Sequence, residues 1–227
     1  MFGVFKLYVK NISKKFDREV LKNVSAEFEN GTINAVAGKN GCGKSTLLKI
    51  ITTILKQDSG DIFINDKNLK DNPEFVRKKI GYVSQENSLL DDLSVRNNII
   101  FFSDVYRVER NFFNLSDEVL NKKLKNLSGG MRKKINILIS LLNNPEFLIL
   151  DEPTANLDLY HKEEILNLIK DFKNAGKCVI FTSHNIDEII IADKLFVINN
   201  GNIVFNDTPS KLNINNGFKE NLYKLIF

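Results

Sequence analysis

A glycine-rich segment at residues 38–45 constrains the fold of this chain more than any other feature. Its sequence, GKNGCGKS, fits the pattern G-x-x-x-x-G-K-[ST], and it lies between an apolar run at residues 32–37 and a helical pattern at residues 46–55. Glycines in such a loop allow backbone N–H groups to close around phosphate oxygens, and the dipole of the following helix attracts the anion. The sequence therefore predicts a phosphate-binding turn between a buried strand and a helix.

Two kinds of strand pattern occur along the chain. Short apolar runs next to helical patterns are typical of buried parallel strands, and they lie at residues 32–37, 147–150 and 178–182. Segments that mix apolar and polar residues are typical of half-exposed strands, and they lie at residues 5–10, 24–28 and 61–64. We therefore expect an α/β fold with a parallel central sheet and an antiparallel β subdomain.

Helical periodicity and turn residues predict further elements. Apolar residues recur at i, i+3, i+4 and i+7 in residues 135–142 and 165–172, and Gly176 is expected to end the second helix. The turn residues at 199–201 separate strand-like runs at residues 194–198 and 202–206, which predicts a hairpin.

Length and composition indicate a single globular domain. The chain has 227 residues, of which 43% are hydrophobic and 26% charged, close to the averages for globular proteins. No linker or internal repeat is visible. We expect one domain over residues 1–227, in which residues 86–142 form an inserted, mainly helical subdomain.

Charge, cysteine content and hydropathy exclude several functional classes. No apolar run approaches the roughly 18–20 residues that a membrane-spanning helix needs, and the start of the chain shows no secretory signal. The net charge of +4 is modest and its lysines are scattered, so we expect no nucleic-acid partner. Two cysteines are too few for a disulfide framework, which fits a reducing compartment such as the cytoplasm.

Two adjacent carboxylates, Asp151 and Glu152, follow the predicted strand at residues 147–150. Two acids at a strand end also occur in solvated turns, but together with the phosphate loop they resemble a Walker B motif. In this interpretation Lys44 contacts the terminal phosphates, and Ser45 and Asp151 hold Mg²⁺. Glu152 orients and deprotonates the attacking water, which is general-base catalysis worth about 10²–10⁴ in rate.

The segment LSGGM, at residues 127–131, lies between these two motifs and shortly before the predicted helix at residues 135–142. Two glycines at a helix start expose N–H groups to an anion, which predicts a second phosphate-binding surface; a flexible Ser-Gly-Gly loop is the alternative. With this segment the chain resembles the ABC ATPase family, and the resemblance covers nearly the whole chain. It implies a P-loop NTPase fold in which LSGGM contacts the γ-phosphate held by another subunit.

The resemblance also suggests roles for residues outside these motifs. Phe16 corresponds to the aromatic that stacks on adenine, and a core phenylalanine is the alternative. Gln85 corresponds to the Q-loop glutamine, which contacts Mg²⁺ and joins the core to the helical subdomain. Asp158 corresponds to the D-loop acid that reaches the opposing subunit, with a helix N-cap as a competing or additional role. His184 corresponds to the H-loop histidine beside the γ-phosphate, whereas His161 is expected on a solvated helix face without a role.

The expected site therefore contains three overlapping groups of residues. The catalytic residues are Lys44, Glu152 and His184. The metal ligands are Ser45, Gln85 and Asp151. The nucleotide-binding residues are Phe16, Gly38, Asn40, Gly41, Cys42, Gly43, Lys44, Ser45, Thr46, Gln85, Ser128, Gly129, Gly130 and Asp158.

The position of Cys42, one of the nucleotide-binding residues, also predicts the reactivity of its thiol. It lies two residues before Lys44 and near the start of the predicted helix, in surroundings that stabilise a thiolate over a thiol. This predicts a reactive thiol. An inert small residue with its side chain turned away is the alternative.

The resemblance implies an ATP-binding and ATP-hydrolysing subunit of an ABC transporter. Such a subunit dimerises head to tail with a second copy or a related chain around two Mg-ATP, and it drives separate permease subunits from the cytoplasmic face of the cell membrane. Met131, followed by three basic residues, resembles exporter-type systems. An importer subunit and a soluble non-transport ABC ATPase are the alternatives, whereas Glu152 and His184 argue against a scaffold that has lost hydrolysis.

Overall fold

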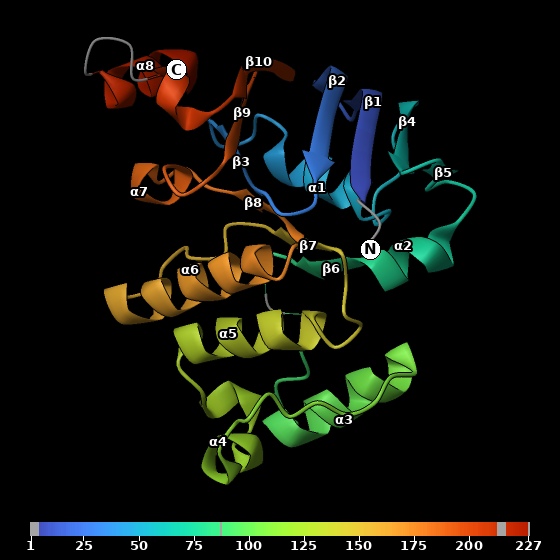
Figure 1. The fold of residues 1–227 in the computed structure, drawn as a ribbon, viewed down its shortest axis with the longest axis vertical. Coiled ribbons are helices and arrows are strands. Elements are labelled where there is room, and N and C mark those ends of the chain that lie inside the picture. The colour runs from blue at the N-terminus through green and yellow to red at the C-terminus, as the bar shows by residue number, and fades with distance from the viewer. Residues whose placement is uncertain (1–4, 87, 213–216, 227) are drawn as a thin grey trace.

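The computed structural model describes residues 5–86, 88–212 and 217–226 (Figure 1). Within these ranges, six strands form a central sheet in the order β10-β9-β3-β8-β7-β6. Their bounds are β3 Ile33–Gly38, β6 Ile80–Val83, β7 Phe147–Leu150, β8 Cys178–Thr182, β9 Lys194–Asn199 and β10 Asn202–Asp207. The strands from β9 to β6 pair in parallel, and β10 pairs antiparallel with β9. The predicted parallel sheet and terminal hairpin are confirmed.

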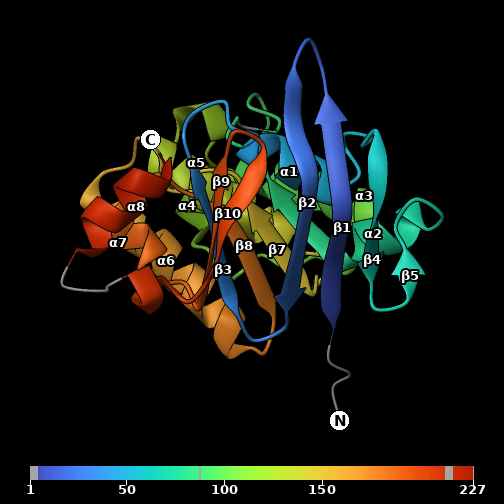
Figure 2. The same cartoon turned by 90° about the horizontal axis from the view of Figure 1, so that it is seen from above.

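A second, antiparallel sheet has the strand order β2-β1-β4-β5 (Figure 2). Its strands are β1 Lys6–Lys15, β2 Glu19–Glu29, β4 Ser59–Ile64 and β5 Lys67–Asn68. β1 and β2 extend well beyond the predicted runs at residues 5–10 and 24–28. Their register shifts close to Asn11 and Asn23, which have φ angles of 52° and 50°. Because these irregularities interrupt the alternation of polar and apolar residues, the pattern underestimated the length of both strands.

Helices cover both faces of the central sheet. They are α1 Lys44–Ile51, α2 Pro73–Lys79, α6 Leu159–Asn174, α7 Ile186–Ile189 and α8 Phe218–Ile226, with a 3₁₀ turn at Pro209–Leu212. The helical pattern at residues 46–55 is too long, since α1 ends at Ile51 and Thr53 takes a φ of 59°. Gly176 follows the end of α6 with a φ of 78°, as a helix-terminating glycine does. In the described part of the chain, no helix has the length and apolar character needed to cross a bilayer.

The segment between β6 and β7 is helical and lies at the opposite end of the molecule from the antiparallel sheet (Figure 1). Its elements are α3 Val95–Tyr106, α4 Asp117–Asn121, a 3₁₀ turn at Leu124–Asn126 and α5 Gly129–Ser140. It has a hydrophobic core of its own that includes Val95, Ile99, Leu124 and Ile135. Helix α5 begins at Gly129, inside LSGGM, so this motif forms the first turn of the helix.

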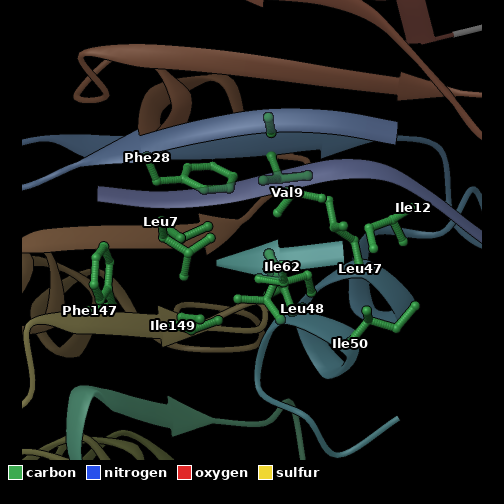
Figure 3. Packing of buried hydrophobic residues seen from close by; sticks show 14 of the residues in the cluster. Leu7, Val9, Ile12, Phe28, Leu47, Leu48, Ile50, Ile62, Phe147 and Ile149 are labelled. Carbon is green, nitrogen blue, oxygen red and sulfur yellow. The ribbon is translucent and has the colours of Figure 1, made fainter. Parts of the chain in front are cut away.

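The antiparallel sheet packs against α1 and one face of the central sheet. In Figure 3, side chains from β1, β4 and α1 gather in one layer above β7. Those labelled include Leu7, Val9, Leu48 and Ile62, which lie over Ile149 of β7, and all five are at most 2% exposed. Burial of such side chains stabilises each by about 1.5–3 kcal/mol, so this layer fixes the position of α1 and of the loop that precedes it.

The parallel strands bring the predicted site residues to one edge of the central sheet. β3 ends in Gly38 and the phosphate loop, and β6 ends shortly before Gln85. β7 is followed directly by Asp151, and β8 is followed by Ser183 and His184. Carboxyl ends of parallel strands meet at one edge, which is where α/β proteins bind ligands.

Candidate functional site

The phosphate loop wraps closely around the side chain of Lys44, which is only 5% exposed. Its Nζ donates to the carbonyl oxygens of Gly38 at 2.8 Å and Lys39 at 3.3 Å. Gly43 has a φ of 113°, and a Cβ at this position would lie 2.7 Å from Leu21 Cδ2. The loop therefore requires glycine on steric grounds, and it holds a buried cation beside a helix N-terminus, a combination that attracts phosphate.

A cavity of about 470 Å³ opens in front of this loop. It is lined by Phe16, Val20, Asn40, Gly41, Gly43, Lys44, Ser45, Thr46, Gln85 and Glu152. The structure thus brings most of the predicted nucleotide-binding residues around one space. The described lining does not include Ser128, Gly129, Gly130 or Asp158, which lie on α5 and at the start of α6.

Phe16 lies at this cavity with 53% of its surface exposed. Lys14 Nζ lies 5.4 Å from the centre of its ring. The alternative that Phe16 is a core residue is therefore wrong. An exposed aromatic face next to the phosphate loop is suited to stacking on a planar base.

Asp151 is buried, with 3% of its surface exposed, and its Oδ1 accepts two hydrogen bonds. Ser45 Oγ donates to it at 3.0 Å and Thr182 Oγ1 at 2.7 Å. In the described residues there is no group of three or more His, Cys, Asp or Glu side chains able to hold a metal. Ser45, Asp151 and the Gln85 amide instead supply a few hard oxygen donors. Such a donor set fits Mg²⁺, which is usually held by one or two carboxylates together with water and substrate phosphates.

The carboxylate of Glu152 lies between two of the other predicted site residues. Its Oε1 is 3.5 Å from His184 Nδ1, and its Oε2 accepts from Gln85 Nε2 at 3.4 Å. The side chain of Glu152 is 16% exposed, whereas that of His184 is 64% exposed. A proton acceptor is therefore held at the edge of the cavity, with a histidine and an amide on either side.

Two residues that the sequence analysis did not assign also organise this site. Besides binding Asp151, Thr182 Oγ1 accepts from the backbone N–H of Glu152 at 2.8 Å. Lys133 Nζ donates to the carbonyl oxygens of Ser84 at 3.0 Å and Gln85 at 3.5 Å. Burial lowers the pKa of Lys133, although the charges of Asp151 and Glu152 act in the opposite direction. The three basic residues after Met131 drew attention to this part of the sequence. Nothing in their pattern, however, indicated that Lys133 is the one that points inward.

His161 does not lie on a solvated helix face, as the sequence analysis expected. Its side chain is only 17% exposed, because the ring packs against Gly130 of α5. Its Nδ1 is 2.7 Å from Asp158 Oδ2, and its Nε2 is 3.4 Å from Ser128 Oγ. The expectation failed because helical periodicity places a residue on a face without showing which neighbour covers that face.

The environment of Cys42 argues against a thiolate. The side chain packs against the hydrophobic layer between the antiparallel sheet and α1, and a Cβ on Gly38 would lie 2.6 Å from its Sγ. Burial raises the pKa of the Cys42 thiol, and the charge of Lys44 only partly counters this. The predicted stabilisation of the thiolate is therefore wrong, and Cys42 does not line the cavity of about 470 Å³. Burial also raises the pKa of Cys178, to about 12.

Fold and site together define a class, the phosphate-loop nucleotide hydrolases that carry an antiparallel β subdomain and a helical insertion. A family model described as "ABC transporter" matches residues 21–155, more than half of the chain. The match includes the phosphate loop, LSGGM and the two carboxylates after β7. The chain belongs to the ABC transporter family and is an ATP-binding domain of that family.

Relatives of the chain come from bacteria and from eukaryotes. It is 30% identical over 215 residues to ABC transporter G family member 20 of Dictyostelium discoideum, covering 90% of this chain and 30% of that protein. It is 29% identical over 219 residues to the linearmycin resistance ATP-binding protein LnrL of Bacillus subtilis, covering 91% and 70%. It is 30% identical over 212 residues to the carnitine transport ATP-binding protein OpuCA of Listeria monocytogenes, covering 87% and 53%. The chain thus spans less than two thirds of the first and third of these relatives.

Solved structures share the fold at low sequence identity. One, an ATP-binding subunit of an ABC transporter, superposes with a TM-score of 0.82 at 23% identity, covering 96% of this chain and 98% of that one. Another is a dimeric, post-hydrolysis state of the ATP-binding cassette MJ0796 bound to ADP and Pi. It superposes with a TM-score of 0.77 at 26% identity, covering 89% and 98%.

Proposed function

We propose that this chain is the ATP-hydrolysing subunit of an ABC transporter whose membrane-spanning parts are separate polypeptides. In this proposal residues 1–227 act as one cassette, with residues 86–142 as its inserted helical subdomain. The observation that carries the proposal is the meeting of Lys44, Ser45 and Glu152 around one cavity, with Asp151 hydrogen-bonded to Ser45 behind it. LSGGM lies outside that cavity at the start of α5.

Each side chain around the cavity has a separate task in this proposal. Phe16 stacks on the adenine, and the loop N–H groups with Lys44 bind the phosphates. Ser45, Asp151 and Gln85 would hold Mg²⁺, which neutralises charge on the phosphate oxygens. Glu152 takes the proton of the attacking water, and His184 orients the γ-phosphate that the water attacks.

The second half of each site comes from another subunit, either a second copy or a related chain. Ser128, Gly129 and Gly130 present the N-terminus of α5, which is suited to a phosphate held by the opposing subunit. His161 contacts both Asp158 and Ser128, so Asp158 lies close to these residues. In this proposal Asp158 contacts the same opposing subunit. The dimeric MJ0796 structure supports this arrangement. Hydrolysis removes the γ-phosphate that bridges the two subunits, so the closed dimer loses its preferential stabilisation and opens.

We propose that the transporter exports its substrate from the cytoplasm and that this subunit binds its permease at the inner face of the membrane. Export is favoured by Met131 with the basic residues that follow it, and by the similarity to a linearmycin resistance protein. Import is the second candidate, because a carnitine transport protein is equally similar. No role in nucleic-acid binding is proposed.

The replacement Glu152→Gln tests this function. It removes the proton acceptor but leaves the phosphate and metal ligands, so Mg-ATP binding should persist while phosphate release falls by at least about 100-fold. A dimer should then accumulate with Mg-ATP and be visible in size-exclusion chromatography. Glu163→Gln, an identical change at an exposed position of α6, is the control and should hydrolyse ATP normally. A normal rate in Glu152→Gln would contradict the proposed base.

A further inference from the structure

The two loops proposed to face the opposing subunit are joined within one chain by a single side chain, His161. Its backbone N–H donates to Asp158 Oδ1 at 2.9 Å, and its Nδ1 lies 2.7 Å from Asp158 Oδ2. On the other side of the ring, Nε2 lies 3.4 Å from the hydroxyl of Ser128. Ser128 Oγ also accepts from the backbone N–H of Met131 at 3.2 Å, which caps α5.

The ring of His161 is fixed by packing as well as by these polar contacts. A Cβ on Gly130 would lie 2.1 Å from its Cγ and 2.4 Å from its Cδ2, so the imidazole sits directly on the glycine backbone. The neighbouring ring of Tyr160 contacts it edge-on, with centroids 5.5 Å apart. The ring therefore fills the space between the starts of α5 and α6.

The charge of Asp158 determines which ring nitrogen of His161 donates a hydrogen bond. The hydrogen bonds from His161 lower the pKa of Asp158, which therefore remains a carboxylate and can only accept. Nδ1 must then donate to Asp158, which leaves Nε2 facing the hydroxyl of Ser128. An apolar side chain of similar size would keep the packing on Gly130 but lose both polar links.

We propose that His161 is a positioning residue that couples Asp158 to Ser128 and holds both loops in the arrangement that receives the opposing subunit's nucleotide. This inference rests on the proposed function, because it requires Ser128 to act on a nucleotide bound by another subunit. Beyond that function, it identifies a specific internal link between the two loops. His161 itself contacts neither nucleotide nor metal.

The test compares ATP-dependent dimerisation of full-length variants in a Glu152→Gln background, where hydrolysis does not consume the ligand. His161→Leu should raise the ATP concentration for half-maximal dimerisation by about five- to tenfold, the effect of losing one or two hydrogen bonds. His161→Gln retains polar atoms and should recover most of this loss. Glu163→Ala, on an exposed position of α6, is the matched control and should have no effect.

A second comparison separates positioning from simple structural support. In a Ser128→Ala background, His161→Leu should cause a clearly smaller further change, since one of the two groups it links is gone and only Asp158 is left to position. An equal loss with and without Ser128, or no loss in either background, would overturn the inference. If the Glu152→Gln protein fails to dimerise with ATP while His161 is intact, the proposed dimer itself is wrong. Thermal unfolding of each variant shows that it is folded.

Discussion

At the scale of single residues, the backbone of Glu152 accounts for the position of its side chain. Its φ is 45°, a left-handed conformation that is uncommon for a residue other than glycine. Such a conformation costs on the order of 1–3 kcal/mol and persists only where the surroundings enforce it. The hydrogen bond from its N–H to Thr182 Oγ1 helps to hold Glu152 in this conformation. The resulting turn directs the carboxylate away from the axis of β7 and towards His184.

The packing of His161 within the same subunit leaves no space for a side chain at Gly130. Because a Cβ would lie 2.1 Å from His161, Gly130→Ala should destabilise the monomer by about 1–3 kcal/mol through overpacking. The measurement is the free energy of unfolding in denaturant. Gly129→Ala is the control, since a Cβ at Gly129 meets nothing within 4 Å.

Combining Gly130→Ala with His161→Ala should restore part of the lost stability, because the smaller side chain leaves room for the methyl group. Equal stability of Gly130→Ala and Gly129→Ala would show that the packing of His161 on Gly130 is not tight. The same contact means that a charged residue at position 130 changes both the monomer and the dimer, so it does not isolate the role of LSGGM.

At the scale of elements, an ion pair between a half-buried lysine and a buried glutamate ties α6 to α7 and to the end of β8. Lys162 Nζ of α6 lies 2.9 Å from Glu188 Oε1 of α7, and their side chains are 18% and 6% exposed. Ser183 Oγ, just before His184, donates to Glu188 Oε2 at 2.6 Å. Glu188 therefore helps to hold the loop that carries His184 and, through Lys162, the helix that Asp158 caps.

Glu188→Ala should reduce the free energy of unfolding by about 1–3 kcal/mol, because it leaves the half-buried charge of Lys162 and the buried hydroxyl of Ser183 without their partner. Asp187→Ala, at the exposed neighbouring position, should change stability little. Lys162→Met combined with Glu188→Leu should be less destabilising than Glu188→Ala alone, since no charge is then left without a partner. A Glu188→Ala protein as stable as the Asp187→Ala control would contradict this account.

At the scale of the whole molecule, the fold divides the proposed chemistry between two places. The phosphate loop and Glu152 lie at the carboxyl edge of the central sheet, whereas LSGGM starts α5 in the helical segment. Among the described residues that line the cavity in front of Lys44, none belongs to LSGGM. A complete site on this proposal needs two copies arranged head to tail.

Mixing two inactive variants tests this arrangement. Lys44→Ala removes the phosphate contact in the cavity of the subunit that carries it. Ser128→Arg blocks the LSGGM surface that this subunit presents to the nucleotide of the opposing subunit. Each variant alone should be inactive, but a mixed dimer contains one intact composite site. An equal mixture should therefore recover about a quarter of the wild-type ATPase rate, since half of the dimers are mixed and each has one working site of two. No recovery in the mixture would contradict the composite site.

The sequence by itself determined the fold class, the two kinds of sheet and the position of the phosphate loop, because these follow from local periodicity and from the backbone needs of glycine. It also indicated Asp151, Glu152 and LSGGM, whose residue types carry their chemistry. Only the tertiary structure decided the environments of His161, Cys42, Lys133 and Thr182. Their burial and partners depend on which elements pack together, and contacts such as that between Gly130 and His161 join positions that no local pattern relates.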